Sequence, residues 1–156
     1  MSQVYLSREG YEKLQDELQH LKVKERPTVR EALQHAREFG DLAENAEYSA
    51  AKERLLLLEQ RIGRLEETLS RACLLENEKI PDDKVYIGAT VDLVDLKTQK
   101  ELRYTLVAPE EADFAQAKIS TVSPIGQGLL GHAPGDEVEI RVPAGLLHYR
   151  IAKISR

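Results

Sequence analysis

The sequence is short of cysteine and of aromatic residues, and it contains no long apolar run. Its single cysteine, Cys73, excludes an internal disulfide and a zinc site built on cysteines. We interpret Cys73 as a small apolar residue among the apolar residues of a helix. No apolar segment approaches the roughly 18–20 residues of a membrane-spanning helix, and no signal peptide is recognisable. These absences predict a cytoplasmic protein with no membrane segment.

The composition favours exposed helix over a compact sphere. Charged residues make up 31% of the 156 residues, hydrophobic residues 42% and aromatic residues only 5%. The net charge of −5 argues against nonspecific nucleic-acid binding by the whole surface, although it leaves room for a local basic patch.

The first part of the chain has the apolar spacing of a long helix. Ser7 is a suitable N-cap, and Leu6 and Tyr11 can form a hydrophobic staple around it. Apolar residues then alternate at spacings of three and four: Tyr11, Leu14, Leu18 and Leu21. The repeat resumes in a shifted frame at Val29, Leu33 and Ala36. Pro27 lies near this shift and lacks a backbone N–H, which predicts a kink or irregularity before the helix ends near Phe39.

A second helical segment has a more regular pattern. A strict alternation of four and three residues runs through Ala51, Leu55, Leu58, Ile62, Leu65, Leu69 and Ala72. Only a few residues separate the two segments, so they are expected to pair as an antiparallel coiled-coil hairpin. At about 1.5 Å per residue, arms of roughly 33 residues would reach about 50 Å, longer than a small domain needs for its own core. We therefore expect a projecting rod.

The tip of this hairpin carries two carboxylates. Gly40 is suited to the left-handed conformation that ends a helix. Asp41 is suited to N-cap the second helix, with Glu44 three residues on as in a capping box. Spacing alone favours such a capping role, which does not exclude a role in binding a metal ion.

The pattern changes after Ile80-Pro81-Asp82-Asp83, which breaks the helix. Alternation with period two predicts strands at 90–96, 102–107, 119–122, 137–142 and 147–154. A short helix or loop is expected at 124–130. The fold class is therefore α+β, a hairpin followed by a small, mostly antiparallel β domain. We expect a finger over 1–78 with its acidic tip at 40–47, a linker over 79–83 and a C-terminal domain over 84–156.

Several motifs resemble one known family. They are Gly-Asp-Leu-Ala-Glu-Asn-Ala-Glu-Tyr at 40–48, Ala-Ala-Lys-Glu at 50–53, Ile-Gly-Ala-Thr-Val at 87–91, Glu-Ala-Asp-Phe at 111–114, Ser-Thr-Val-Ser-Pro-Ile at 120–125 and Gly-Leu-Leu-Gly at 128–131. In this order they resemble the Gre family of transcript-cleavage factors of bacterial RNA polymerase, over essentially the whole chain. The modest basicity fits the GreA branch better than the more basic GreB branch.

The resemblance implies a fold and a partner. It implies a C-terminal domain of FKBP-like fold that docks at the rim of the polymerase secondary channel. The coiled-coil finger then passes down the channel and places its acidic tip beside the active site. The docking residues implied are those of the loop at Ser120, Ser123, Pro124 and Ile125. We expect a monomer that acts on the 3′ end of the nascent RNA.

The resemblance also gives the tip carboxylates a role. Asp41 and Glu44 would help to hold a Mg²⁺ ion shared with the polymerase active site, only within the polymerase complex, and would orient the attacking water. Two carboxylates cannot complete a two-metal hydrolytic site. The chain is therefore expected to be no enzyme and to have no cofactor of its own. It would activate the polymerase's own cleavage of backtracked RNA and rescue arrested complexes.

Basic residues along the finger suggest contact with the RNA backbone. The candidates are Arg37, Lys52, Arg30 and Arg26. Phosphate contacts of this kind position a strand without recognising its sequence. The alternative is ordinary solvated flanks that pair with neighbouring glutamates. Contact is favoured at Arg37 and Lys52, which lie closest to the tip and match basic positions in the family.

Other interpretations remain open at this point. An inhibitory Gre homologue would occupy the channel without stimulating cleavage, although the intact pair of Asp41 and Glu44 argues against it. Prolyl isomerase activity needs an apolar pocket rich in aromatics, and the C-terminal region has few: Tyr86, Tyr104, Phe114 and Tyr149. A channel binder of the DksA kind would resemble a zinc protein with four cysteines, whereas this chain has one. Glu47 is expected to be solvated, and Tyr48 to contact RNA or pack over the hairpin end.

Overall fold

The computed structural model describes residues 2–156, which divide into two compact units. Residues 9–72 form most of the first unit, and residues 3–8 and 73–156 form the second. The sequence had assigned 3–8 and 73–78 to the finger. In the structure these residues belong to the second unit instead, and β1 (Val4–Leu6) pairs with β2 (Ala72–Leu74) in a two-stranded sheet. Strands of three residues are too short to show a period along the sequence.

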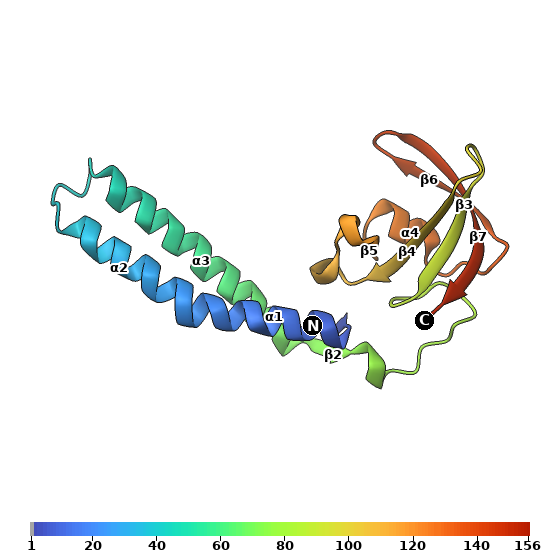
Figure 1. Ribbon diagram of the computed structural model, residues 1–156, viewed down its shortest axis with the longest axis horizontal. Helices are drawn as coiled ribbons and strands as arrows, with labels where there is room; N and C mark the ends of the chain where they lie inside the picture. The colour runs from blue at the N-terminus through green and yellow to red at the C-terminus, as the bar shows by residue number, and fades with distance from the viewer. Residues whose placement is uncertain (1) are drawn as a thin grey trace. The chain divides into compact units, whose positions relative to one another are not determined.

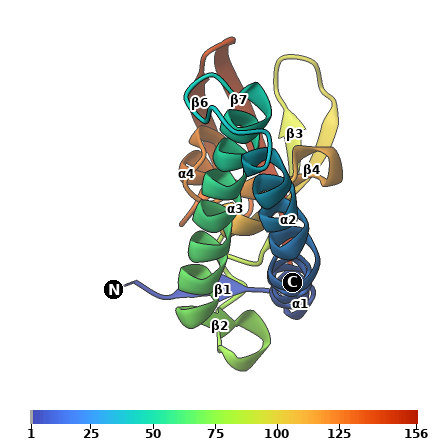
Figure 2. The ribbon, with the colours of Figure 1, turned by 90° about the vertical axis from the view of Figure 1, so that its left-hand side faces the viewer.

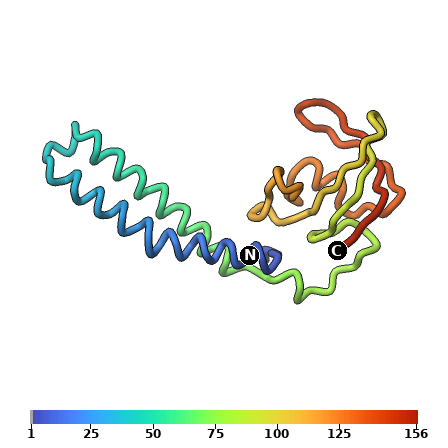
Figure 3. Tube along the Cα trace, in the orientation of Figure 1, coloured from blue at the N-terminus to red at the C-terminus, as the bar shows by residue number. Residues whose placement is uncertain are grey.

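The first arm of the hairpin is one continuous helix built from three parts: α1 (Arg8–His20), the π-helical segment η1 (Leu21–Glu25) and α2 (Arg26–Arg37). The tube in Figure 3 follows it without a break. The backbone N–H of Arg26 bonds to the carbonyl of Leu21, five residues back. This wider turn takes up one extra residue, which explains the shifted frame of the apolar repeat. The irregularity predicted near Pro27 is confirmed.

The second arm is α3 (Ala46–Ser70), which runs antiparallel to α2 (Figures 1 and 2). Their shared interface contains the apolar residues predicted from the repeat. The residues of the predicted repeat that are buried are Leu14, Val29, Leu33 and Ala36 on the first arm and Ala51, Leu58, Ile62 and Leu65 on the second. The helix ends before Ala72, so the prediction that Cys73 lies in a helix is wrong. Cys73 is a half-buried residue of β2.

Two bidentate ion pairs connect the arms. The guanidinium group of Arg26 donates to both carboxylate oxygens of Glu59, at 2.8 and 2.9 Å. Arg61 donates in the same way to Glu17, at 2.6 and 2.8 Å. Planar forks of this kind are geometrically selective. They therefore help to fix the register of the two arms.

The second unit is built on a five-stranded sheet in the order β5-β4-β3-β7-β6. Its strands are β3 (Thr90–Asp95), β4 (Glu101–Val107), β5 (Lys118–Ser120), β6 (Glu137–Val142) and β7 (Gly145–Ser155). Only the β4–β5 pair is parallel. The predicted α+β class and mostly antiparallel sheet are therefore confirmed. Short helical turns η2 (Leu75–Asn77), η3 (Pro109–Glu111) and η4 (Phe114–Gln116) connect the rest, with the helix α4 (Pro124–Leu129).

The core of the second unit follows the period of two. Val91 and Leu93 on β3 alternate with less buried neighbours, as do Val138 and Ile140 on β6. Leu129, the last residue of α4, is fully buried against this core. The sheet and α4 thus form a rigid base for the loop that joins β5 to α4.

The pair of Arg61 and Glu17 predicts a pH dependence of stability. The hydrogen bonds from Arg61 hold the pKa of Glu17 below its usual value. A carboxyl whose pKa is lower in the folded state stabilises fully above its unfolded pKa of about 4.3, and this contribution is lost as the pH falls. Glu17→Gln should therefore lower the free energy of unfolding by about 0.5–1 kcal/mol at pH 7, since both side chains are partly exposed and screened. The difference should shrink toward zero at pH 3, measured by urea unfolding.

Glu12→Gln is the matched control. Glu12 is exposed on the same helix and makes no ion pair within residues 2–156. It should change the free energy of unfolding little at either pH. A Glu17→Gln effect of the same size at pH 7 and pH 3 would show that the pair does not act through charge.

Candidate functional site

The hairpin turns back through a short loop between α2 and α3, at the free end of the hairpin in Figure 1. The N–H groups of Glu38, Phe39 and Gly40 each bond three residues back, at 3.1–3.3 Å, which tightens the end of α2. Gly40 then has a φ of +71°, with nothing within 4 Å of the place a Cβ would occupy. Glycine is needed here for its left-handed backbone and not for space. The predicted helix stop is confirmed.

Asp41 does not cap the second helix, so that prediction is wrong. Asp41 has a φ of +44°, whereas an N-cap residue takes an extended backbone. The N-cap of α3 is Asn45, with φ −82° and ψ +103°, and its side-chain oxygen accepts from the N–H of Tyr48 at 3.0 Å. Glu44 is consequently no capping-box partner. The chain needs the residues from Asp41 to Glu44 to reverse direction, and a turn closes them with Glu44 N–H bonded to Asp41 O at 3.1 Å.

Asn45 was not singled out from the sequence, although a signal was present. Asparagine is among the best N-cap residues, and Asn45 stands directly before the helical run of α3. Its side-chain nitrogen donates to Ala36 O at 2.7 Å and lies 3.4 Å from Gly40 O. One side chain therefore caps the start of α3 and also binds carbonyls at the end of α2.

The two tip carboxylates, Asp41 and Glu44, are exposed. Neither the Asp41 nor the Glu44 side chain makes a hydrogen bond or ion pair within residues 2–156. By contrast, Glu17 and Glu59 on the same hairpin are held by arginines. Carboxylate oxygens are the ligands that Mg²⁺ prefers, and Mg²⁺ usually takes one or two of them together with waters and phosphates. The donor set at the tip fits a partial magnesium site.

The described residues do not complete such a site. No group of three or more histidine, cysteine, aspartate or glutamate side chains within residues 2–156 is arranged to hold a metal ion. Any ion held by Asp41 and Glu44 would need further ligands from another molecule. The roles of these two residues remain predictions.

The basic residues of the finger divide into two groups. Arg26 is held by Glu59 in the bidentate pair described above, and Arg30 lies 3.9 Å from the same carboxylate. Arg37 and Lys52 make no ion pair within residues 2–156, and Arg37 lies over the ring of Tyr48 at 5.9 Å. The structure therefore gives Arg26 a role within the hairpin, whereas Arg37 and Lys52 near the tip have no ion pair within residues 2–156.

The tip also exposes apolar surface. Phe39 is 63% exposed and meets the ring of His35 edge-on at 5.3 Å, and Leu42 is also exposed. Tyr48 is half-buried, and Arg37 lies over its ring. It therefore packs at the hairpin end, which is one of the two alternatives predicted for it. Glu47 is exposed and makes no contact within residues 2–156, as expected for a solvated side chain.

The predicted docking loop of the second unit is rigid because its hydroxyl groups bond internally. The Ser123 hydroxyl donates to Ser120 O at 2.6 Å and accepts from Gly126 N at 3.1 Å, which caps α4. The Ser120 hydroxyl accepts from Val122 N at 3.1 Å. A Cβ on Gly126 would collide with Ser120 O, so glycine is required there by close packing. Ser120 and Ser123 shape the loop, and their predicted contact with a partner remains untested.

The surface that this loop presents is apolar. Val122 is 62% exposed, Pro124 is exposed and Ile125 is half-buried. Pro124 and Ile125 line a groove of about 360 Å³ together with Phe114 and Pro143. Phe114 is 73% exposed and lies 6.3 Å from the ring of Tyr104. Neither Val122 nor Phe114 was predicted as a docking residue, because a single sequence does not show which apolar residues the fold leaves exposed.

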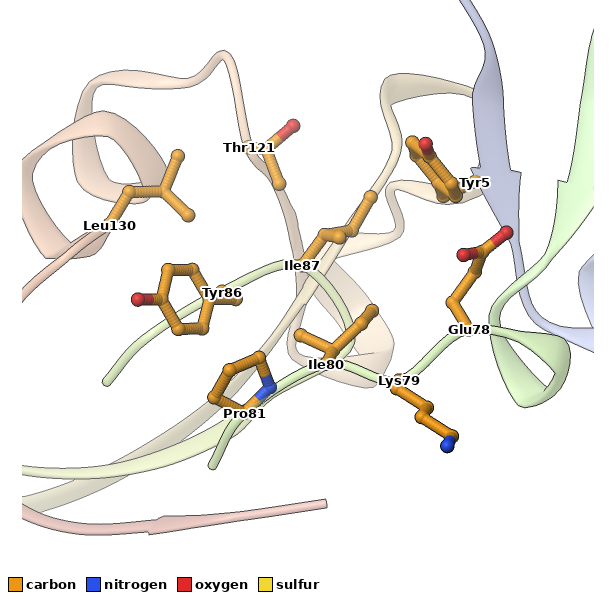
Figure 4. Close-up of a pocket in the computed structure, with 9 residues that line it drawn as sticks. All are labelled: Tyr5, Glu78, Lys79, Ile80, Pro81, Tyr86, Ile87, Thr121 and Leu130. Atoms are coloured by element: carbon orange, nitrogen blue, oxygen red, sulfur yellow. The ribbon is translucent and has the colours of Figure 1, made fainter. Parts of the chain in front are cut away.

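A second cleft of the same unit, of about 440 Å³, bears on the isomerase alternative (Figure 4). Tyr86 lies beside Pro81 and Ile80 there, and the other aromatic ring in the cleft is Tyr5. Tyr149 is buried in the core, and Tyr104 and Phe114 lie elsewhere. The four aromatic residues of the C-terminal region thus do not gather in one pocket, which gives an isomerase site no support.

Two further observations limit the class of protein. No helix within residues 2–156 is both long enough and apolar enough to cross a membrane. The hairpin ends in a short loop with two exposed carboxylates, Asp41 and Glu44. The fold is that of a two-unit α+β protein, a helical hairpin with an acidic end followed by a small β domain.

Comparison with known proteins identifies the family. Residues 4–73 match the family described as "Transcription elongation factor, N-terminal", and residues 80–156 match "Transcription elongation factor, GreA/GreB, C-term". The transcription elongation factor GreA of Chloroherpeton thalassium is 50% identical over 150 residues, which cover 96% of this chain and 95% of the relative. GreA of Nitratidesulfovibrio vulgaris (strain DP4) is 45% identical over 154 residues, with 99% and 94% covered.

A solved structure is similar as well. The GreA factor homolog 1 of Thermus thermophilus has 32% sequence identity with coverage of 99% of both chains and a TM-score of 0.46. The chain belongs to the GreA/GreB family of transcription elongation factors, and its full-length relatives are of the GreA type. The resemblance seen in the sequence motifs is confirmed.

Proposed function

We propose that this protein binds RNA polymerase in its secondary channel and stimulates the polymerase's own endonucleolytic cleavage of backtracked RNA. The observation that carries the proposal is the pair of exposed, unpartnered carboxylates, Asp41 and Glu44, at the end of a long hairpin. A capping role would have given both side chains hydrogen-bond partners, and neither has one within residues 2–156. Carboxylate oxygens without partners within residues 2–156 are available to coordinate a metal ion that another molecule holds.

The length of the hairpin supports delivery over a distance. The continuous helix from Arg8 to Arg37 spans roughly 40–45 Å at about 1.5 Å per residue. Its interface is apolar and its register is fixed by two bidentate ion pairs, so the tip is carried on a stiff support. Stiffness matters because small errors in the position of a catalytic group reduce rates strongly.

The proposed division of labour follows from ligand chemistry. A bound Mg²⁺ would supply charge stabilisation and activation of a water for phosphodiester hydrolysis. Asp41 and Glu44 would provide two of its oxygen ligands and orient that water, while the remaining ligands come from the polymerase and the RNA. The protein would have no nuclease activity alone, because its own residues provide only part of the site.

Arg37 and Lys52 are the proposed contacts to the extruded RNA. Both lie near the tip on opposite arms and have no competing ion pair within residues 2–156. Arg26 and Arg30 share the carboxylate of Glu59, which reduces what they can offer to phosphates. We therefore expect Arg26 and Arg30 to contribute less to RNA binding than Arg37 and Lys52.

Docking is proposed for the loop at Ser120–Ile125 and the groove beside it. The serines hold the loop, and the exposed side chains of Val122, Pro124 and Phe114 form the apolar surface. A rigid apolar surface loses little conformational freedom on binding. This loop and groove are therefore suited to bind an apolar strip on the polymerase.

The first prediction concerns the tip carboxylate. Asp41→Asn should reduce cleavage of stalled, backtracked complexes by roughly 10²-fold, the scale on which loss of one charge-stabilising group slows an enzyme. The free energy of unfolding should change by less than about 0.5 kcal/mol, because Asn tolerates the left-handed backbone of Asp41. Cleavage rates at limiting Mg²⁺ and thermal unfolding measure the two effects.

Glu47→Gln is the control for this variant. It removes one exposed carboxylate near the tip and should keep nearly full stimulation. Cleavage by Asp41→Asn at close to the wild-type rate would exclude the metal-ligand role. A wild-type protein that occupies the channel without increasing cleavage would instead favour the inhibitory alternative.

The second prediction separates RNA contact from docking. Arg37→Ala combined with Lys52→Ala should weaken engagement of the extruded RNA, and the slope of log affinity against log salt should fall by roughly 0.7 for each lost phosphate contact. Binding to polymerase without backtracked RNA should be unchanged. The double variant Lys13→Ala with Lys24→Ala removes two exposed cations farther from the tip and should behave as wild type. Loss of polymerase binding without RNA would assign Arg37 and Lys52 to the polymerase.

The third prediction tests the docking surface. Val122→Ser should raise the concentration needed for half-maximal stimulation about ten-fold, which corresponds to about 1.4 kcal/mol, while the rate at saturation stays unchanged. Leu146→Ser is the control, because Leu146 is another exposed apolar residue of the same unit. An effect from Leu146→Ser and none from Val122→Ser would place docking elsewhere on the protein.

A further inference from the structure

The geometry points to Asn45 as a positioning residue of the tip. We propose that its carboxamide, by binding the end of α2, holds Asp41 in the left-handed conformation and so sets where the Asp41 carboxylate lies relative to Glu44. The inference rests on the proposed function of the two carboxylates. It adds a residue that contacts neither metal nor RNA and acts through the backbone of Asp41.

The first step is the backbone of Asp41. Two successive residues, Gly40 and Asp41, have φ values of +71° and +44°. Left-handed conformation is unfavourable for a residue with a Cβ, and aspartate adopts it only when its surroundings favour it. Something must therefore hold the loop in this shape, because a short exposed loop has many alternative conformations.

The second step is the pair of bonds on either side of Asp41. Gly40 O belongs to the peptide group that precedes Asp41, and the Asn45 amide nitrogen lies 3.4 Å from it. Asp41 O, in the peptide group that follows, accepts from Glu44 N at 3.1 Å. The stronger contact of the Asn45 amide, 2.7 Å to Ala36 O, fixes that amide at the end of α2. Asp41 thus lies between two held peptide groups.

The third step is the choice of side chain. Aspartate and serine cap a helix start about as well as asparagine, because capping needs only an acceptor for the N–H of Tyr48. An ionised aspartate has no hydrogen to donate, and a serine hydroxyl has one on a shorter side chain. Only asparagine among these combines the acceptor with an NH₂ group that can serve carbonyls of α2. Capping and positioning can therefore be separated by substitution.

The test uses the full-length protein with Asn45→Asp and Asn45→Ser. Both variants should keep α3 capped, so the melting temperature should fall little. Both should lower the maximal rate of cleavage about ten-fold, with the half-saturating protein concentration within two-fold of wild type and a higher Mg²⁺ requirement. Gln34→Glu adds one negative charge to the exposed face of α2 near the tip and serves as the charge control. It should leave all three quantities unchanged.

A measurement without polymerase tests the contact itself. In isotope-labelled full-length protein, NMR couplings and chemical shifts should show Asp41 in a left-handed conformation in wild type. The left-handed signature should be lost in Asn45→Asp, while the Tyr48 amide stays protected by its cap. An unchanged Asp41 conformation in that variant would overturn the inference, since a merely structural cap would leave it intact.

The cleavage results distinguish the inference from the proposed function. If Asn45→Asp cleaves at the wild-type rate while Asp41→Asn does not, the positioning role is wrong and the proposed function stands. If both variants cleave at the wild-type rate, the proposed function fails and the inference fails with it. Cleavage by Asn45→Asp that is slow at the assay temperature but equals that of wild type well below the melting temperature would also overturn the inference. The slow rate would then reflect partial unfolding of the variant alone.

Discussion

The tip of the hairpin depends on how two helix ends satisfy their backbone groups. The last carbonyls of α2 and the first N–H groups of α3 have no partners within their own helices. Asn45 serves both ends, since it accepts from Tyr48 N and donates to Ala36 O. One side chain therefore bonds a backbone group at each of the two helix ends. The side chains of Asp41 and Glu44 between the helices are exposed and make no hydrogen bond or ion pair within residues 2–156.

The rest of the finger keeps this tip in place. The apolar interface of the arms gives stability without direction, and the bidentate pairs of Arg26 with Glu59 and Arg61 with Glu17 fix the register. The π-helical segment at Leu21–Glu25 absorbs one extra residue and lets the seam continue toward the tip. Arg26, Glu59, Arg61 and Glu17 thus have partners that stabilise the hairpin, whereas the side chains of Asp41 and Glu44 have no hydrogen-bond or ion-pair partner within residues 2–156.

Much of the fold was predictable from the sequence, because its main elements have long repeating patterns. The heptad spacing of α3 and the period of two in the sheet repeat over many residues, so the hairpin and the mostly antiparallel domain followed from them. The frame shift near Pro27 correctly indicated an irregular turn. The strands β1 and β2 were missed because each is three residues long and their pairing is non-local. The N-cap was assigned to Asp41 instead of Asn45, since both residue types are good caps and only the left-handed backbone of Asp41 distinguishes them.

The central proposal is that the loop between α2 and α3 reaches the catalytic metal of the polymerase. Its most direct test replaces Mg²⁺ with Fe²⁺ in a backtracked polymerase complex and maps where hydroxyl radicals released at the metal cut the bound wild-type protein. The account predicts cuts confined to the loop and adjoining turns, within about residues 38–48, and none in the protein without polymerase. Cuts in the second unit, cuts scattered along the finger, or none in the complex would contradict it.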